Sequence, residues 1–159
     1  MLDHVVKCLR ESDFIDRVLL LSPHRVGAIS VVHDEGRGLN EELCHARNRI
    51  GLGPLLVLPA DLPLLQTEDI NALLQAAVLH GQAIAPDRDV TGTNAIAIAD
   101  GTPMQWRFGA NSFAEHRTTL PANHAVVERP GLQLDCDTPD GLSCAERAGF
   151  AWRRLPASY

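Results

Sequence analysis

Short apolar runs alternate with amphipathic segments along most of this 159-residue chain, and this alternation limits the available folds more than any other feature. The clearest run, residues 55–58, lies between Pro54 and Pro59, as is typical of a strand buried on both faces. Strands that alternate with helices predict βαβ units. We therefore expect an α/β protein with a three-layer, mainly parallel sheet, formed as a single domain over residues 1–159.

The other expected elements follow from hydrophobic periodicity and from turn residues. Thr67 is a plausible N-cap for the helix that follows the 55–58 strand, and Gly81 ends that helix. The expected helices cover residues 2–12, 40–50, 67–80, 112–120 and 141–148, and the other expected strands cover residues 18–21, 29–32, 83–85, 95–99, 125–127 and 132–134.

Composition and charge exclude several classes of protein. Hydrophobic residues make up 45% and charged residues 21%, and 20 acidic against 14 basic residues leave a net charge of −6. This balance argues against a surface that coats nucleic acid, and no apolar run is long enough to cross a membrane. The N-terminus has no signal-like apolar segment, and the cysteines show no zinc-type spacing. We expect a cytoplasmic protein with reduced thiols and without a nucleic-acid or membrane partner.

The carboxylate of Asp61 follows the 55–58 run and stands between Pro59 and Pro63. Each proline fixes φ at about −65°, so the turn that carries the carboxylate is stiff. Ligands of open α/β sheets bind beyond the carboxyl ends of strands, where a carboxylate can hold a metal ion. Because Asp is also a common turn residue, the local sequence leaves two interpretations open, a metal ligand or a turn cap.

Two further carboxylates, Asp135 and Asp137, lie between an expected strand and the last expected helix. In an extended segment alternate side chains share one side, so both can face the same ligand. Carboxylates from two strand ends suffice for magnesium, because Mg²⁺ binds a few carboxylates together with the oxygens of a phosphorylated substrate. The alternative is that Asp137 or Thr138 caps the last helix.

Two loops of small residues, Thr91–Asn94 and Phe108–Ser112, are candidates for binding an anion. Glycine lets backbone N–H groups approach an anion closely, and Ser112 at a helix N-terminus would add the helix dipole. Thr93 also offers a hydroxyl group, and His116 lies one turn beyond Ser112. Each signal has a structural alternative, since loop glycines commonly serve turns and a lone histidine on a helix is more often structural.

Five segments of the chain together resemble one enzyme family, the 2-phospho-L-lactate guanylyltransferases, which include phosphoenolpyruvate guanylyltransferases. The resemblance covers nearly the whole chain and implies the nucleotide-diphospho-sugar transferase type of fold, related to molybdenum-cofactor guanylyltransferases. It also implies a role in the biosynthesis of the deazaflavin coenzyme F-420. The segments are residues 58–65 (LPADLPLL), 85–88 (APDR), 92–95 (GTNA), 108–116 (FGANSFAEH) and 134–142 (LDCDTPDGL).

The resemblance further implies a reaction and a set of site residues. The phosphate of 2-phospholactate, phosphoenolpyruvate or 3-phosphoglycerate would attack the α-phosphorus of GTP and release pyrophosphate. Catalysis would rest on positioning and charge neutralisation, without a protein nucleophile. The implied residues are Asp61 and Asp137 as catalytic magnesium ligands with Asp135 nearby, Thr93, Gly109 and Ser112 for the acceptor, and Gly38, Leu39 and Asn40 for the guanine nucleotide.

The sequence departs from this family at its N-terminal end. Family members begin with a strand and a Lys/Arg-bearing loop that grips the triphosphate, whereas Met1 aligns with the first family helix. The resemblance therefore implies an N-terminally truncated fold with a gap beside residues 55–58. In the loop at residues 36–40, which the resemblance places at the guanine base, Arg37 separates two glycines that are adjacent in the family. Three explanations stay open: a misplaced start or a fragment, a fold that is rearranged or completed by a partner, and a non-catalytic homologue that binds a phospho-acid or acts as a partner subunit, as in a homodimer.

Overall fold

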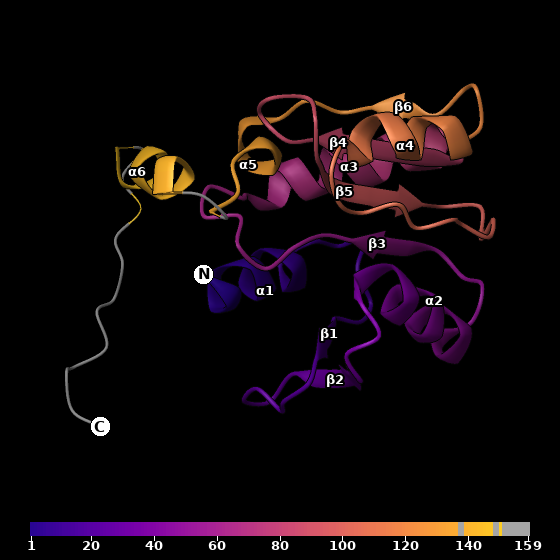
Figure 1. Cartoon of the computed structure of the whole chain (residues 1–159), viewed down its shortest axis with the longest axis horizontal. Coiled ribbons are helices and arrows are strands. Elements are labelled where there is room, and N and C mark those ends of the chain that lie inside the picture. The colour runs from indigo at the N-terminus through magenta and orange to yellow at the C-terminus, as the bar shows by residue number, and fades with distance from the viewer. Residues whose placement is uncertain (137–138, 148–149, 151–159) are drawn as a thin grey trace.

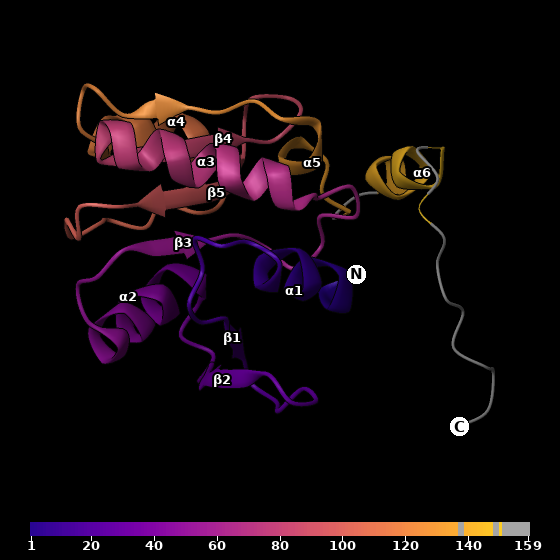
Figure 2. The ribbon, with the colours of Figure 1, turned by 180° about the vertical axis from the view of Figure 1, so that it is seen from behind.

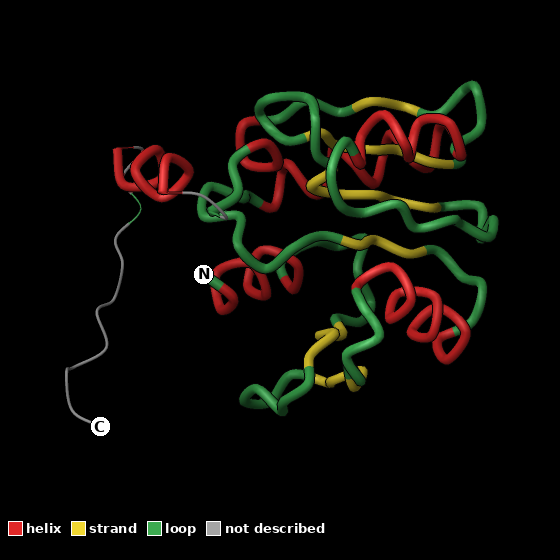
Figure 3. Tube along the Cα trace, viewed as in Figure 1, coloured by secondary structure: helices red, strands yellow, loops and turns green. Residues whose placement is uncertain are grey.

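The computed structural model describes residues 1–136, 139–147 and 150. Helices and strands alternate along the chain (Figures 1 and 3), which confirms the α/β class. In chain order the elements are α1 (Leu2–Arg10), β1 (Leu19–Ser22), β2 (Ser30–His33), α2 (Leu39–Ile50), β3 (Leu55–Val57), α3 (Thr67–His80), β4 (Gln82–Pro86), β5 (Thr93–Ile98), α4 (Ser112–Thr119), β6 (Ala125–Val126), α5 (Pro130–Gln133) and α6 (Pro139–Arg147). Within this part of the chain, no helix is both long and apolar enough to cross a lipid bilayer.

The described residues form a main sheet of four strands in the order β3-β5-β4-β6. Strands β3, β4 and β6 run in one direction, and β5 runs antiparallel to both of its neighbours. The reversal of β5 follows from its short connection to β4, because a loop of a few residues joins antiparallel strands whereas parallel strands need a longer crossover. The sheet is therefore mixed, with three strands parallel to one another, as expected, and one interior strand reversed.

Strands β1 and β2 form a second, two-stranded sheet that lies apart from the main one (Figure 1). They pair in parallel, although only residues 23–29 connect them. Among the described residues, no strand pairs with the second edge of β3. Strand β3 is thus an edge strand of this sheet, and its side chains are half-buried for that reason. The gap that the resemblance implies beside it stays a prediction.

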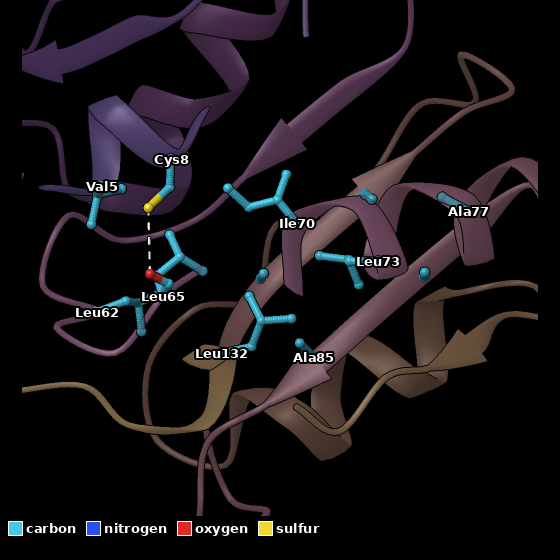
Figure 4. Packing of buried hydrophobic residues seen from close by; sticks show 12 residues of the cluster. Val5, Cys8, Leu62, Leu65, Ile70, Leu73, Ala77, Ala85 and Leu132 are labelled. Atoms are coloured by element: carbon cyan, nitrogen blue, oxygen red, sulfur yellow. Dashed lines mark hydrogen bonds between the residues drawn. The ribbon is translucent and has the colours of Figure 1, made fainter. Parts of the chain in front are cut away.

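Side chains that alternate along β4 and β5 separate two apolar faces of the main sheet. Small alanines of both strands face α1, α3 and α5, while isoleucines of the same strands face α2 and α4. Views from opposite sides show α3 on one face and α4 on the other (Figures 1 and 2). The buried side chains of the first face include Val5, Cys8, Leu62, Leu65, Ile70, Leu73, Ala77 and Leu132 (Figure 4).

The expected strand at residues 132–134 is wrong, because the chain forms the helical turn α5 there. Pro130 stands in the first turn of this helix, where its missing N–H group is not needed. The N–H group of Leu132 donates to the carbonyl group of Arg129 at 2.9 Å, and the turn leaves Leu132 only 1% exposed. Asp135 therefore follows a helical turn and not a strand.

The expected N-cap of α3 is displaced by one residue. Gln66 is the N-cap, and it forms a capping box with Asp69, in which each side chain bonds the backbone N–H group of the other residue. Thr67 instead donates its hydroxyl group to the carbonyl group of Cys8 in α1, at 3.3 Å. The start of α3 is thereby attached to α1.

Candidate functional site

The carboxyl ends of β3 and β4 and the start of β5 lie at one end of the main sheet. Val57 of β3 is paired with Ile96 of β5, and Pro86 of β4 is paired with Thr93 of β5. The chain that leaves β3 toward Asp61 and the loop that joins β4 to β5 are therefore at this same end. Ligands of α/β sheets commonly bind beyond the carboxyl ends of strands, which makes this end the candidate site.

The turn that carries Asp61 is fixed by the residues that follow it. Asp61 is half-buried, whereas Leu62 and Leu65 are fully buried in the cluster beside α1 and α3 (Figure 4). Two side chains of α1 donate to the carbonyl oxygen of Leu65: His4 Nε2 at 2.8 Å and Cys8 Sγ at 3.3 Å. Burial raises the pKa of the Cys8 thiol, so the thiol keeps the proton that it donates. Helix α1 thus holds the segment on which Asp61 stands.

Asp87 organises the loop between β4 and β5. Its carboxylate accepts hydrogen bonds from the backbone N–H groups of Thr91 at 2.9 Å and Gly92 at 2.7 Å. A Cβ atom at position 92 would lie only 2.6 Å from this carboxylate. The close approach of Asp87 therefore accounts for the glycine at this position.

Thr93, Ser112 and His116 form a buried hydrogen-bonded chain that joins the start of β5 to α4. The backbone N–H group of Thr93 donates to Ser112 Oγ at 2.9 Å, and Thr93 Oγ1 lies 3.0 Å from His116 Nδ1. The N–H group of Arg107 donates to His116 Nε2 at 2.9 Å, so the ring proton is on Nδ1 and is donated to Thr93. Burial lowers the pKa of His116 to about 4, which keeps the ring neutral.

The hydroxyl groups expected to bind the acceptor are therefore engaged inside the fold. Thr93 is 7% exposed and Ser112 is 3% exposed. The neighbouring loop residues 109–111 are exposed instead, and Gly109 (φ 130°) and Asn111 (φ 55°) have left-handed backbone conformations. The accessible residues of this loop thus lie directly before the N-terminus of α4, a location that favours anions.

Asn40 links the loop expected at the guanine base to the loop expected at the acceptor. Its side-chain amide donates to the carbonyl group of Phe108 at 2.9 Å and accepts from the N–H group of Phe108 at 2.8 Å. Gly38 and Leu39, the other two residues expected at the nucleotide, are exposed directly before this bridge. The structure thus brings residues 38–40 next to the loop that contains Gly109.

Glu42 shapes the loop at residues 35–40, the loop expected at the guanine base, from the first turn of α2. Its Oε1 atom accepts the N–H groups of Glu35 at 2.9 Å and Arg37 at 3.1 Å, and its Oε2 atom pairs with the Arg37 guanidinium at 3.0 Å. Burial raises the pKa of Glu42, but these donors outweigh burial and hold the pKa below its ordinary value. Because Glu42 is only 1% exposed, the loop at residues 35–40 is folded around a buried charge.

The segment that carries Asp135 is attached to the start of β5 and to the end of β4. Asn94 Nδ2 donates to the carbonyl group of Leu132 at 2.9 Å, and the N–H group of Arg88 donates to the carbonyl group of Gln133 at 2.9 Å. Asp135 follows two residues later, at the same end of the sheet as the Asp61 turn. Asp137 lies outside the described residues, and within them no three His, Cys, Asp or Glu side chains gather as for a metal ion. The pairing of Asp61 with Asp137 as magnesium ligands stays a prediction.

Comparison with known proteins identifies the family. Residues 1–125 match the family described as "Guanylyl transferase CofC like". The chain belongs to this family. The phosphoenolpyruvate guanylyltransferase of Sphaerobacter thermophilus is 39% identical over 95% of this chain and 78% of its own length. Proteins of the same name from Rubrobacter xylanophilus and Geodermatophilus obscurus are 36% and 37% identical over 94% and 79% of this chain, and over 79% and 57% of their own lengths. The chain is thus a nucleotidyltransferase of the guanylyltransferase type, as its five segments implied.

Three carboxylates that organise the site of this guanylyltransferase were not expected from the sequence: Glu42, Asp69 and Asp87. Asp87 did carry a signal, because an Asp at the start of a short glycine-containing loop commonly caps the backbone of that loop. Glu42 and Asp69 stand in the first turns of helices, where acidic residues are common for dipole reasons. Their positions therefore gave no sign that both side chains are buried, with Glu42 paired to Arg37 and Asp69 paired to Arg129.

The groups gathered at this end of the sheet suit phosphate chemistry. Asp61 and Asp135 carry hard carboxylate oxygens, while residues 109–111 are exposed directly before α4, whose dipole favours an anion. Asn40 keeps the two loops of this guanylyltransferase together. The arrangement can therefore position a polyphosphate and a second anion side by side.

Proposed function

We propose that this protein transfers GMP from GTP to a small phosphorylated carboxylic acid and releases pyrophosphate. The observation that carries the proposal is the meeting of two loops, residues 38–40 and 108–112, through Asn40 at the end of the sheet that bears Asp61. One loop suits a nucleotide and the other suits an anionic acceptor. Phosphoenolpyruvate is the first acceptor to test, because the relatives from S. thermophilus and R. xylanophilus are named for it.

In the proposed reaction a phosphate oxygen of the acceptor attacks the α-phosphorus of GTP. The bond between the α-phosphorus and the bridging oxygen breaks, and pyrophosphate leaves with that oxygen. Residues 109–111 and the N-terminus of α4 would orient the acceptor, while Gly38 and Leu39 would contact the base. Asn40 would act through Phe108, because both ends of its amide are already bonded there. Catalysis then rests on positioning and on stabilisation of charge.

Magnesium fits the oxygen ligands at this end of the sheet. Asp61 stands on a turn held by α1, and Asp135 stands on a segment held by Asn94 and Arg88. We propose that Asp61, together with Asp137 or Asp135, would hold the ion. When bound, Mg²⁺ supplies positive charge against the triphosphate and the leaving pyrophosphate. The protein's own contribution is to keep the two carboxylate-bearing segments at one fixed separation.

The biological setting is part of the same proposal. A product in which GMP is joined to a phospho-acid suits the biosynthesis of the deazaflavin coenzyme F-420, and we propose a cytoplasmic enzyme of that route. The acceptors 2-phospholactate and 3-phosphoglycerate differ from phosphoenolpyruvate by small groups, and one such group is commonly worth only about 1–3 kcal/mol in discrimination. The preferred acceptor therefore has to be identified by measuring turnover with each of the three.

The test is pyrophosphate release by the purified protein with Mg²⁺, GTP and each of the three acceptors in separate reactions. We expect turnover with at least one acceptor. Asp61→Asn keeps the size of the side chain and should reduce turnover to background. Asp13→Asn removes an exposed carboxylate outside the candidate site and serves as the matched control. Equal turnover by the Asp61→Asn variant and the control would contradict the assignment of Asp61.

A wild-type protein that releases no pyrophosphate would contradict the enzyme proposal itself. Calorimetry with phosphoenolpyruvate then distinguishes the remaining possibilities. Binding without turnover would identify a non-catalytic homologue that retains the acceptor site.

A further inference from the structure

Asp69 contacts two segments of the candidate site, the end of the Asp61 turn and the residue before α5. Its Oδ2 atom accepts the N–H group of Gln66 at 3.1 Å, at the end of the turn that starts with Asp61. Its Oδ1 atom accepts from Arg129 Nε at 2.8 Å, directly before α5. Asp69 is 4% exposed, so the ion pair has one buried partner and one that reaches solvent.

The two segments joined by this ion pair carry the two described carboxylates of the candidate site. Residues 61–66 lead from Asp61 into α3, and residues 129–135 lead from Arg129 through α5 to Asp135. The segments also contribute Leu62 and Leu132 to one buried cluster (Figure 4). Apolar contacts are not directional, whereas a hydrogen-bonded ion pair fixes a direction and a distance.

Gly131 shows how closely the segments approach one another. A Cβ atom at this position would collide with the Asp69 carboxylate and would lie 2.7 Å from the carbonyl oxygen of Leu64. Residue 131 must therefore be glycine if α5 is to rest on the Asp61 turn while Asp69 stays in place. The close approach of the α5 backbone to the Asp61 turn is therefore part of the fold and depends on this glycine.

We propose that the Asp69–Arg129 ion pair is a positioning element that sets the separation of Asp61 and Asp135 and thereby the affinity of the site for a divalent cation. This inference rests on the proposed function, because it takes these carboxylates as lying at the metal site. Neither Asp69 nor Arg129 touches the ion or the substrates in this arrangement. They act through the backbone of the two segments, as residues behind metal ligands commonly do.

The experiment measures Mn²⁺ binding by the electron paramagnetic resonance of the free ion, with the whole protein and without nucleotide. Arg129→Gln removes the charge but keeps a long polar side chain, and it should weaken Mn²⁺ binding by about 10-fold, in the range typical for residues behind metal ligands. Arg129→Lys restores the charge and should recover part of the affinity. In turnover assays the Gln variant should need more metal for half-saturation while keeping most of its rate at saturating metal.

The control is Lys7→Gln, which removes the exposed ion pair between Lys7 of α1 and the C-cap residue Glu11, at 3.6 Å. It should leave Mn²⁺ binding unchanged. Thermal melting of every variant separates folding from positioning. Unchanged Mn²⁺ affinity in a folded Arg129→Gln protein, with an active wild type, would overturn this inference and leave the proposed function standing. A wild type that neither binds Mn²⁺ nor turns over would overturn both.

Discussion

The side-chain amide of Asn40 bonds the N–H and the carbonyl groups of the same residue, Phe108, which lies 68 positions later in the chain. An amide matches this pair of groups because it offers one acceptor and one donor side by side. Asn40 is thus a two-point attachment between the start of α2 and the loop before α4. The relative position of two loops of the candidate site depends on it.

We predict that Asn40→Asp raises KM for both GTP and the acceptor. The substitution keeps the shape of the side chain but places a carboxylate oxygen against the carbonyl oxygen of Phe108, so one hydrogen bond becomes a repulsion. Steady-state kinetics with each substrate varied in turn would measure the effect. Asn48→Asp, at an exposed position of the same helix, is the matched control. A rise in KM for GTP alone would show that Asn40 serves the nucleotide loop without positioning the acceptor loop.

The buried imidazole of His116 predicts a loss of stability in mild acid. Its folded pKa of about 4 lies below the ordinary value of 6.5. Between these values the unfolded chain binds a proton that the folded chain does not, so the free energy of unfolding falls as pH falls, by at most ~1.4 kcal/mol per pH unit. Urea unfolding at a series of pH values across this window measures the slope.

His116→Gln is the test variant for this slope, because glutamine can accept from Arg107 and donate to Thr93 without titrating. Its stability should change less steeply with pH than that of the wild type, whatever its stability at neutral pH. Parallel slopes for the two proteins would mean that other groups, and not His116, dominate the acid response.

The guanidinium of Arg47 is a second buried group, and its unfavourable contribution to the free energy of unfolding can be tested. Its Nε and Nη2 atoms are buried without a hydrogen-bond acceptor among the described residues, one turn after the buried Leu43. Burial lowers the pKa of Arg47, although a guanidinium stays charged in proteins. Arg47→Met should therefore stabilise the protein, by about 1–2 kcal/mol.

Thermal melting in low-salt buffer checks this prediction. Arg49→Met, two residues later and exposed, should change the melting temperature little. A lower melting temperature for the Arg47 variant would contradict this prediction and show that the guanidinium contributes favourably to stability.

Gly131→Ala should destabilise the protein by about 1–3 kcal/mol, as overpacking commonly does. The added methyl group collides with the Asp69 carboxylate, which is already fixed by Gln66 and Arg129. Gly53→Ala is a suitable comparison, because a Cβ atom there meets no atom within 4 Å. Chemical denaturation of both variants would decide the point, and equal stability would mean that the α5 turn can move away at little cost.

Elements with strong periodicity could be predicted from the sequence, but their surroundings could not. The run at residues 55–58 was correctly expected as a strand, yet its side chains are half-buried because β3 lies at a sheet edge. The Leu132-Gln133-Leu134 alternation suggested a strand, whereas Pro130 and the close packing of Gly131 favour a helical turn. Local patterns report which residues are apolar and do not report which neighbours cover them.

The candidate site shows the same limit. The sequence indicated Thr93 and Ser112 as hydroxyl donors to a ligand, and the structure places them against each other and His116, across 19 and 23 positions of chain. Long-range pairing of this kind leaves no periodic signal. The Asp61 turn was easier to predict, because its two prolines and the preceding apolar run are local features.

The contact between Asp69 and Gly131 also constrains how this protein can change over generations. A side chain at position 131 requires a shorter residue at position 69, but a shorter residue there loses both the cap of α3 and the pair with Arg129. Neither single step is favourable, so the two positions are expected to vary together or not at all. Divergent relatives that carry a larger residue at position 131 should therefore attach α5 to the Asp61 turn through different contacts.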